Sequence, residues 1–203
     1  MLFHLNNERG NTDYRKAYKT RKVWKGVKML RFIAVLATVC VVAALVLGGV
    51  NSITKPLIAA QKEKETSQAL KSIMPEAGKY DKKTFSGGDY YKCYRGKKVI
   101  GYVISATGDG YSGDIKMLVG IDSKGVITGI EVLSQTETPG LGARCVQVKR
   151  GQKQPWFLEQ FQGKNAETLA LKGIESITGA TITSEAILKG IKKYVTDFLT
   201  EVK

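Results

Sequence analysis

The sequence predicts an α+β protein in which a single N-terminal transmembrane helix precedes a domain with an antiparallel sheet and flanking helices. Three observations lead to this prediction: an uncharged run at residues 32–54, short alternating segments between residues 90 and 133, and a C-terminal segment with apolar residues at helical spacing. Connections of only a few residues cannot form parallel crossovers, so the alternating segments are expected to pair as antiparallel neighbours. Strands with helices around them are typical of the α+β class.

The N-terminal helix is predicted from length and composition. Phe32 through Thr54 is a run of 23 residues without charge, rich in Val, Leu and Ala. At about 1.5 Å per residue, a helix of that length covers the roughly 30 Å hydrocarbon core of a bilayer. A cleaved signal has an apolar stretch of only about 7–15 residues, and Cys40 lies in mid-helix, where lipid attachment is not expected. We therefore interpret the run as a membrane anchor.

The positive charge of the chain is unevenly distributed. The 203 residues carry a formal net charge of +14, and residues 1–31 alone hold nine basic and two acidic residues. Because basic flanks stay on the cytoplasmic side, residues 1–31 are expected to form a cytoplasmic tail. The rest of the chain is then extracytoplasmic, anchored in the inner or plasma membrane. Half of the charge thus reflects topology and contact with anionic lipid, not nucleic-acid binding.

Behind the anchor we expect a stalk helix over residues 55–75 and a domain over residues 76–203. The stalk sequence is polar, with few apolar residues, and ends at Pro75. In the domain, strands are expected at residues 90–94, 99–106, 115–121 and 126–133, a short helix at 155–161 and a long one at 183–199. The long helix has its apolar residues at helical spacing, namely Ile187, Ile191, Tyr194, Val195 and Phe198.

Three motifs of the domain are candidates for chemistry. The first, Gly108 to Gly113, spells G-x-G-x-x-G. A dinucleotide-binding motif of that form opens a helix, whereas the residues that follow here alternate as in a strand. We interpret the motif as a glycine-rich turn whose backbone can approach a ligand, with Gly110 and Tyr111 as candidate contacts.

The second motif is ETPGLGA, residues 137–143. Pro139 and Gly140 suit the central positions of a type II turn, which needs a positive φ at its third residue. A plain turn is one interpretation. In the other, Gly140 and Gly142 expose backbone to a flat ligand, while Glu137 and Thr138 supply polar contacts.

The third motif, TGATITS at residues 178–184, comes directly before the terminal helix. Its hydroxyl residues are ordinary helix N-caps in one interpretation. A helix N-terminus with free N–H groups is also a ready site for a phosphate. Four hydroxyls and a flexible glycine at that place make a phosphate site the second interpretation.

The order of GYSGDI, ETPGLGA and TGATIT behind one membrane helix resembles the FMN-binding G subunit of Rnf-type ion-translocating electron transport complexes. It is also similar to the related C subunit of sodium-pumping NADH:quinone oxidoreductase. The resemblance extends over residues 30–200. In such proteins FMN is joined through its phosphate to the last Thr of an S/T-G-A-T motif. The resemblance therefore implies a covalent phosphoester at Thr181, within the motif Thr178, Gly179, Ala180 and Thr181.

Two positions depart from the family pattern without changing chemical type. Glu175 stands where the family usually has Asp, and Thr178 where it often has Ser. In the implied site, the hydroxyls of Thr183 and Ser184 bind the remaining phosphate oxygens, and Glu185 points to solvent. The loop that supplies Glu137, Thr138, Gly140, Leu141 and Gly142 is expected to pack on the isoalloxazine ring.

The function that the resemblance implies is electron relay. The chain would be a membrane-anchored flavoprotein in an Rnf-type ferredoxin:NAD oxidoreductase coupled to ion export, one part of a translocase and not a complete enzyme. Its implied partners are other membrane subunits, a flavin transferase for maturation and the lipid bilayer, with no nucleic acid. Two alternatives stay open: a stand-alone flavoprotein for surface electron transfer, and a cofactor-free assembly or binding module.

The sequence predicts no separate catalytic residue and no metal site. Cys40, Cys93 and Cys145 lack the spacing of metal ligands, and there is no cluster of His or carboxylate residues. Cys93 and Cys145 both lie beyond the predicted anchor. Whether they form a disulfide is left open by the sequence.

Overall fold

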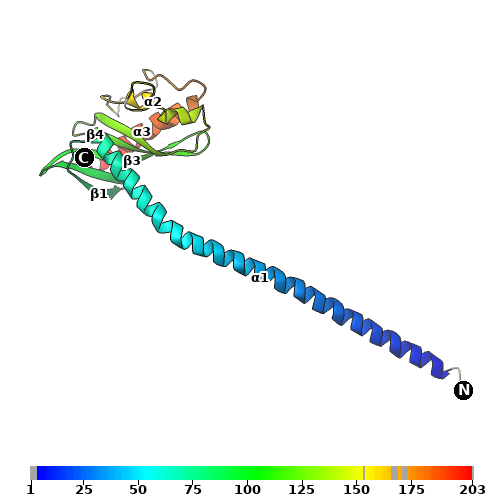
Figure 1. Ribbon diagram of the computed structural model, residues 1–203. Coiled ribbons are helices and arrows are strands. Elements are labelled where there is room, and N and C mark those ends of the chain that lie inside the picture. Colours follow the sequence, from blue (N-terminus) through cyan, green and yellow to red (C-terminus); the bar gives the residue numbers. More distant parts are fainter. Residues whose placement is uncertain (1–3, 153, 166–168, 171–172, 203) are drawn as a thin grey trace. The chain divides into compact units, whose positions relative to one another are not determined.

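The computed structural model describes residues 4–152, 154–165, 169–170 and 173–202, with side chains described from Arg31 onward. It contains a long N-terminal helix with an apolar stretch, a five-stranded antiparallel sheet and a C-terminal helix (Figure 1). The predicted α+β class is therefore confirmed. The chain forms two compact units, Met1–Ala60 and Gln61–Lys203, and each is described by itself.

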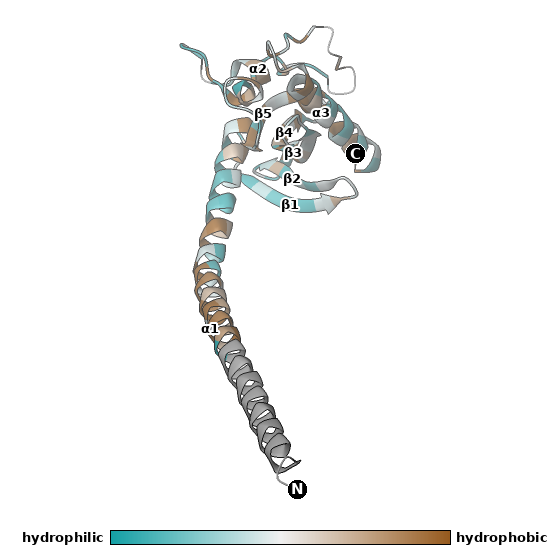
Figure 2. Cartoon of the chain, turned by 90° about the vertical axis from the view of Figure 1, so that its right-hand side faces the viewer, coloured by the Kyte–Doolittle hydropathy of each residue, from teal (hydrophilic) through white to brown (hydrophobic). Residues whose placement is uncertain are grey.

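Helix α1 runs from His4 to Ile73. Its portion Arg31–Ile73 is the one described helix that is long and apolar enough to cross a membrane. Its most apolar 18-residue window has a mean hydropathy of 2.7 and belongs to the brown stretch of α1 in Figure 2. The helix continues through Pro56, although the proline ring removes one backbone hydrogen bond. The side chains of the expected basic tail up to residue 30 lie outside the described part of the chain.

The sheet is a simple meander in which every strand pairs with its neighbours in sequence. The strands are β1 (Lys79–Phe85), β2 (Gly88–Arg95), β3 (Lys98–Asp109), β4 (Asp114–Asp122) and β5 (Ile127–Ser134), in that spatial order, and all pairs are antiparallel. The short connections predicted this arrangement. Four of the strands match predicted segments, whereas β1 was not predicted.

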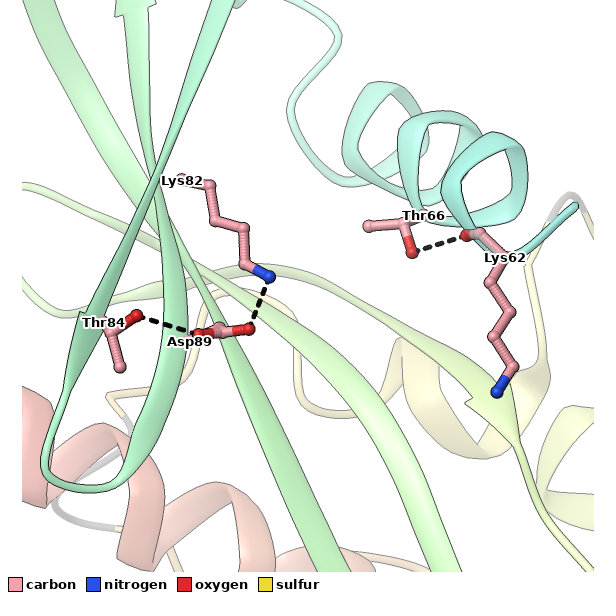
Figure 3. Close-up of polar contacts among 5 residues, drawn as sticks. All are labelled: Lys62, Thr66, Lys82, Thr84 and Asp89. Carbon is pink, nitrogen blue, oxygen red and sulfur yellow. Dashed lines mark hydrogen bonds and ion pairs between the residues drawn. The ribbon is translucent and has the colours of Figure 1, made fainter. Parts of the chain in front are cut away.

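Strand β1 pairs with β2 along its whole length and also makes polar side-chain contacts to it at the sheet edge. The ammonium group of Lys82 lies 2.7 Å from Asp89 on β2, and the Thr84 hydroxyl donates to the same carboxylate at 3.0 Å (Figure 3). In the last turns of α1, the Thr66 hydroxyl donates to the carbonyl of Lys62 at 2.8 Å (Figure 3). The sequence of β1, KYDKKTF, shows no alternation of apolar and polar residues. The strand could therefore not be predicted from such a pattern.

Both faces of the sheet are covered. Val103 faces a cluster with the end of α1, where Leu70 and Ile73 are buried. The next residue, Ile104, faces the larger core formed with α2 (Trp156–Glu159) and α3 (Thr181–Glu201). Figure 1 shows α3 running along the sheet. The apolar stripe predicted for α3 is confirmed, since four of its residues are fully buried: Ile187, Ile191, Val195 and Phe198.

The two cysteines beyond the anchor lie in different cores. Cys93 belongs to the cluster at the end of α1, and Cys145 to the cluster under α3. Both are fully buried and free. The disulfide that the sequence left open is therefore absent between these two residues, because the sheet lies between them.

Candidate functional site

The three sequence motifs meet around one cavity of about 490 Å³. The β3–β4 loop contributes one residue to its lining, the segment after β5 four, and the start of α3 five. They are Tyr111, Glu137, Thr138, Leu141, Gly142, Gly179, Ala180, Thr181, Ile182 and Thr183. Segments about 70 residues apart thus form a single concave site, of the size usual for small-molecule pockets, roughly 300–1,000 Å³.

The first motif forms the loop between β3 and β4. The N–H of Gly110 donates to the carbonyl of Gly113 at 3.1 Å. Strand β4 follows directly, which confirms the predicted turn and contradicts a dinucleotide-binding helix. The Thr136 hydroxyl donates to the carbonyl of Ser112 at 3.4 Å. This contact holds the loop beside the second motif, and the 73% exposed side chain of Tyr111 lies at the cavity.

The second and third motifs contain turns of the same form. The N–H of Leu141 donates to the carbonyl of Thr138 at 3.1 Å, and Gly140 has a φ of +79°. This confirms the predicted turn. The N–H of Ala180 donates to the carbonyl of Ile177 at 2.8 Å, and Gly179 also has a φ of +79°.

The two turns lie against each other. A Cβ atom placed on Gly179 would lie 3.2 Å from the side chain of Leu141. The glycine of the third motif is therefore needed for its positive φ and also leaves room for a side chain of the second. Beyond Leu141, the chain continues into the 3₁₀ helix η1 (Gly142–Val146).

Helix α3 begins at Thr181, two residues before the predicted start, and Ala180 is its N-cap residue. Ala180 has a φ of −138°, and no described side chain caps the first turn. The interpretation of TGATITS as an ordinary hydroxyl cap is therefore wrong. The first N–H groups of α3 point toward the cavity end of the helix without a side-chain acceptor, which is the arrangement that binds anions.

The hydroxyls of this segment point in different directions. Thr181 is exposed at the cavity, and its hydroxyl makes no hydrogen bond to another described residue. Thr183 is 1% exposed and donates to Glu137 at 2.5 Å. Ser184 is fully buried; its hydroxyl accepts the N–H of Ile177 at 2.9 Å and donates to the carbonyl of Ala180 at 3.0 Å.

The earlier helix start changes the roles expected of Thr183 and Ser184. Because α3 already includes Thr183 and Ser184, the helix fixes the direction of both side chains. Both are buried. Ser184 does not line the cavity, and the Thr183 hydroxyl is engaged by Glu137. The expectation that both hydroxyls bind phosphate oxygens does not fit this geometry. Glu185 points outward to Lys189, 2.8 Å away, as expected from the sequence.

A buried carboxylate connects the motifs. Glu137 is 5% exposed, and its Oε1 accepts the N–H of Ser112 at 2.9 Å while Oε2 accepts the Thr183 hydroxyl. Cys145 lies behind it: burial, with a smaller contribution from the Glu137 carboxylate, raises the pKa of this thiol to about 11. Among the described residues, no group of His, Cys, Asp and Glu is arranged to hold a metal ion.

The cavity includes most of the candidate residues but not all. Gly110, Gly140, Thr178 and Ser184 belong to the motifs and do not line it. Ile182 lines it with 53% of its area exposed and was not predicted. The signal available in the sequence was an isolated apolar residue inside a run of hydroxyl residues.

Two family models match the chain. Residues 110–196 match the model of the FMN-binding domain, and residues 28–73 match that of the RnfG N-terminal region. The first match contains the second and third motifs and the first motif from Gly110 onward. The crystal structure of the C subunit of Na⁺-translocating NADH-quinone reductase from Parabacteroides distasonis is also similar. It has 23% identity and a TM-score of 0.44, covering 55% of this chain and 60% of that one.

Curated relatives extend the match over most of the chain. The G subunit of the proton-translocating ferredoxin:NAD(+) oxidoreductase complex of Clostridium ljungdahlii is 31% identical, over 81% of this chain and 89% of that protein. The G subunit of the Na(+)-translocating complex of Acetobacterium woodii is 33% identical, over 83% and 89%. The chain therefore belongs to the RnfG family, the G subunits of Rnf ion-translocating oxidoreductase complexes, and carries their FMN-binding domain.

Proposed function

We propose that this chain carries FMN covalently, through a phosphoester to the Oγ of Thr181, and relays electrons within an ion-translocating ferredoxin:NAD oxidoreductase complex. The observation that carries the proposal is the position of Thr181. It is an exposed hydroxyl in the uncapped first turn of α3, at a cavity lined by all three motifs. The match to the FMN-binding domain supports the identity of the cofactor.

The residues around Thr181 fit a phosphate. A negative group at the N-terminus of the 21-residue helix α3 is stabilised by the helix dipole and by N–H groups that lack a side-chain acceptor. Glu185 is turned away and paired with Lys189, so it contributes little repulsion. Thr178 is also exposed but lies outside the cavity lining, which favours Thr181 as the attachment residue.

The other cavity residues fit a flat aromatic ring. Tyr111, Leu141 and Ile182 expose apolar surface at the cavity, with 73%, 46% and 53% of their areas accessible. Such surface is costly to leave in water and favours stacking against an aromatic ligand. Bound FMN would supply the electron-carrying chemistry, while these residues would hold and orient it.

The topology that we propose follows from charge. Residues 1–31 would form a cytoplasmic tail, residues 32–54 would span the membrane, and residues 55–75 would be a stalk. The domain at residues 76–203 would hold the cofactor outside the cytoplasm. A covalent link suits that location, because a cofactor that dissociates there is lost, whereas noncovalent affinity only slows the loss. Other membrane subunits would be its electron partners, and a flavin transferase would attach the cofactor.

Mass spectrometry of the full chain, produced together with its flavin transferase, tests the proposal. The expected result is an FMN-phosphate adduct on the peptide that contains Thr181. Thr181→Ala should lose the adduct and the flavin fluorescence of the band on a denaturing gel, whereas Thr181→Ser, which keeps a hydroxyl, should retain both. An unmodified Thr181 in the wild type, or an adduct that persists in Thr181→Ala, would contradict it.

A further inference from the structure

The carboxylate of Glu137 lies where the three loops of the site meet. One oxygen accepts the N–H of Ser112 at 2.9 Å, and the other accepts the hydroxyl of Thr183 at 2.5 Å. The residue is only 5% exposed. A single side chain thus connects the β3–β4 loop, the segment after β5 and the first turn of α3.

Two motif glycines leave the space that this carboxylate fills. A Cβ atom on Gly110 would lie 2.5 Å from Oε1 of Glu137. A Cβ atom on Gly142 would lie 2.6 Å from the hydroxyl oxygen of Thr183 and 2.9 Å from the Cβ of Glu137. Neither approach is sterically allowed. The glycine at position 110, which does not line the cavity, is therefore explained by the carboxylate beside it.

No cation neutralises this carboxylate within the described part of the chain. The ion pairs there involve other residues, and the two donors to Glu137 are a peptide N–H and a hydroxyl. The field of a buried carboxylate without a cationic partner is only weakly screened. Because Glu137 lines the cavity, a redox group bound there would lie within this field.

We infer that Glu137 is a positioning residue of the flavin site and that its charge lowers the midpoint potential of the bound flavin. The inference rests on the proposed function, since it requires FMN at Thr181. Through Thr183, Glu137 fixes the turn of α3 that carries Thr181; through Ser112, it fixes the loop that carries Tyr111. Its negative charge makes the addition of electrons in the same cavity less favourable.

Glu137→Gln separates charge from shape. The amide oxygen of Gln can still accept the N–H of Ser112, and its NH₂ group can donate to the Thr183 hydroxyl, which rotates to accept. In a spectroelectrochemical titration of the flavin-loaded full chain in detergent, we expect a higher midpoint potential than in the wild type. A residue with only a structural role would leave the potential unchanged in this variant.

Glu185→Gln is the matched control. It also removes one carboxylate from the first turns of α3, but this carboxylate is partly exposed to solvent and paired with Lys189, so the midpoint potential should stay at the wild-type value. A flavin-loaded Glu137→Gln chain whose potential equals that of the wild type would overturn the inference. So would an equal rise in Glu185→Gln. Absence of flavin from the wild type would instead contradict the proposed function.

Two further variants test the contacts that Glu137 makes with Thr183 and Ser112, without depending on Glu137→Gln. Thr183→Val keeps the carboxylate and removes its hydroxyl donor, so the midpoint potential of the flavin should not rise. A rise would overturn the assignment of the lowered potential to charge.

Hydrogen exchange can be measured on the flavin-free Thr181→Ala chain. Adding Glu137→Ala should accelerate exchange at residues 110–113 and 181–184 together, and an unchanged rate in either segment would contradict the positioning role.

Discussion

At the scale of single residues, the two cysteines beyond the anchor are predicted to be unreactive. Burial raises the pKa of Cys93 to about 12, and burial with the nearby Glu137 carboxylate raises that of Cys145 to about 11. At pH 8 the Cys145 thiol holds on the order of a hundredfold less thiolate than a free cysteine, and the Cys93 thiol on the order of a thousandfold less. In a Cys40→Ala background, a thiol reagent should therefore label the native chain hardly at all.

Unfolding provides the control for this experiment. In denaturant, both thiols of the Cys40→Ala chain should react at the rate of a free cysteine, because each is buried only in the folded state. Rapid labelling of either residue in the native chain would contradict this burial. Failure to label in denaturant would instead reveal a disulfide.

Features of the site could be predicted from the sequence only where residues adjacent in the chain determine them. The turn at Gly140 follows from Pro139-Gly140, and the position of Thr181 follows from the motif. The inward orientation of Thr183 and Ser184 was not predictable, because it depends on a helix start two residues earlier than periodicity indicated. The contact between Glu137 and Thr183 joins residues 46 positions apart, and no pattern in one sequence reports such a pair.

At the scale of elements, the contact between β3 and α3 depends on a close backbone approach. A Cβ atom on Gly108 would lie 2.5 Å from the carbonyl oxygen of Ala186. We predict that Gly108→Ala lowers the free energy of unfolding by about 1–3 kcal/mol, since helix and strand must separate to admit the methyl group. Chemical denaturation of the full chain in detergent measures this change.

Gly78→Ala is the control for that substitution. No atom lies within 4 Å of the position that a methyl group on Gly78 would take, and its φ is not unusual. The same chemical change should therefore leave stability within about 0.5 kcal/mol of the wild type. Equal effects of the two substitutions would show that the β3–α3 approach is not close. The amount of flavin adduct should also be lower in Gly108→Ala, because the substitution displaces α3, the helix that carries Thr181.

A strand could be predicted from the sequence where one of its faces is buried, because burial produces an alternation of apolar residues. A strand without such a buried face could not be predicted. Strand β4 buries Ile115, Met117 and Ile121 on one face, which produces the alternation seen in the sequence. Strand β1 is an edge strand with mostly exposed residues. It is held by backbone pairing to β2 and by the one buried side chain of Phe85, so its sequence shows no apolar period.

At the scale of the whole molecule, charge and hydropathy divide the chain into a basic N-terminal segment, an uncharged apolar segment and the remaining domain. The basic residues before position 32 and the uncharged run after it predict a single crossing with the N-terminus in the cytoplasm. The helix in this region has the required length and mean hydropathy. Its direction across a membrane is a prediction from the sequence alone, and the covalent attachment proposed for the cofactor suits that direction.

Cysteine labelling in cells tests the orientation. In a Cys40→Ala background, Thr20→Cys and Lys124→Cys place one reactive thiol in the basic tail and one in the exposed β4–β5 turn. Because Cys93 and Cys145 are buried, they should contribute no background. In spheroplasts, a membrane-impermeant maleimide should label Lys124→Cys at once and Thr20→Cys only after detergent is added. The reverse pattern would place the cofactor domain in the cytoplasm and contradict the proposed topology.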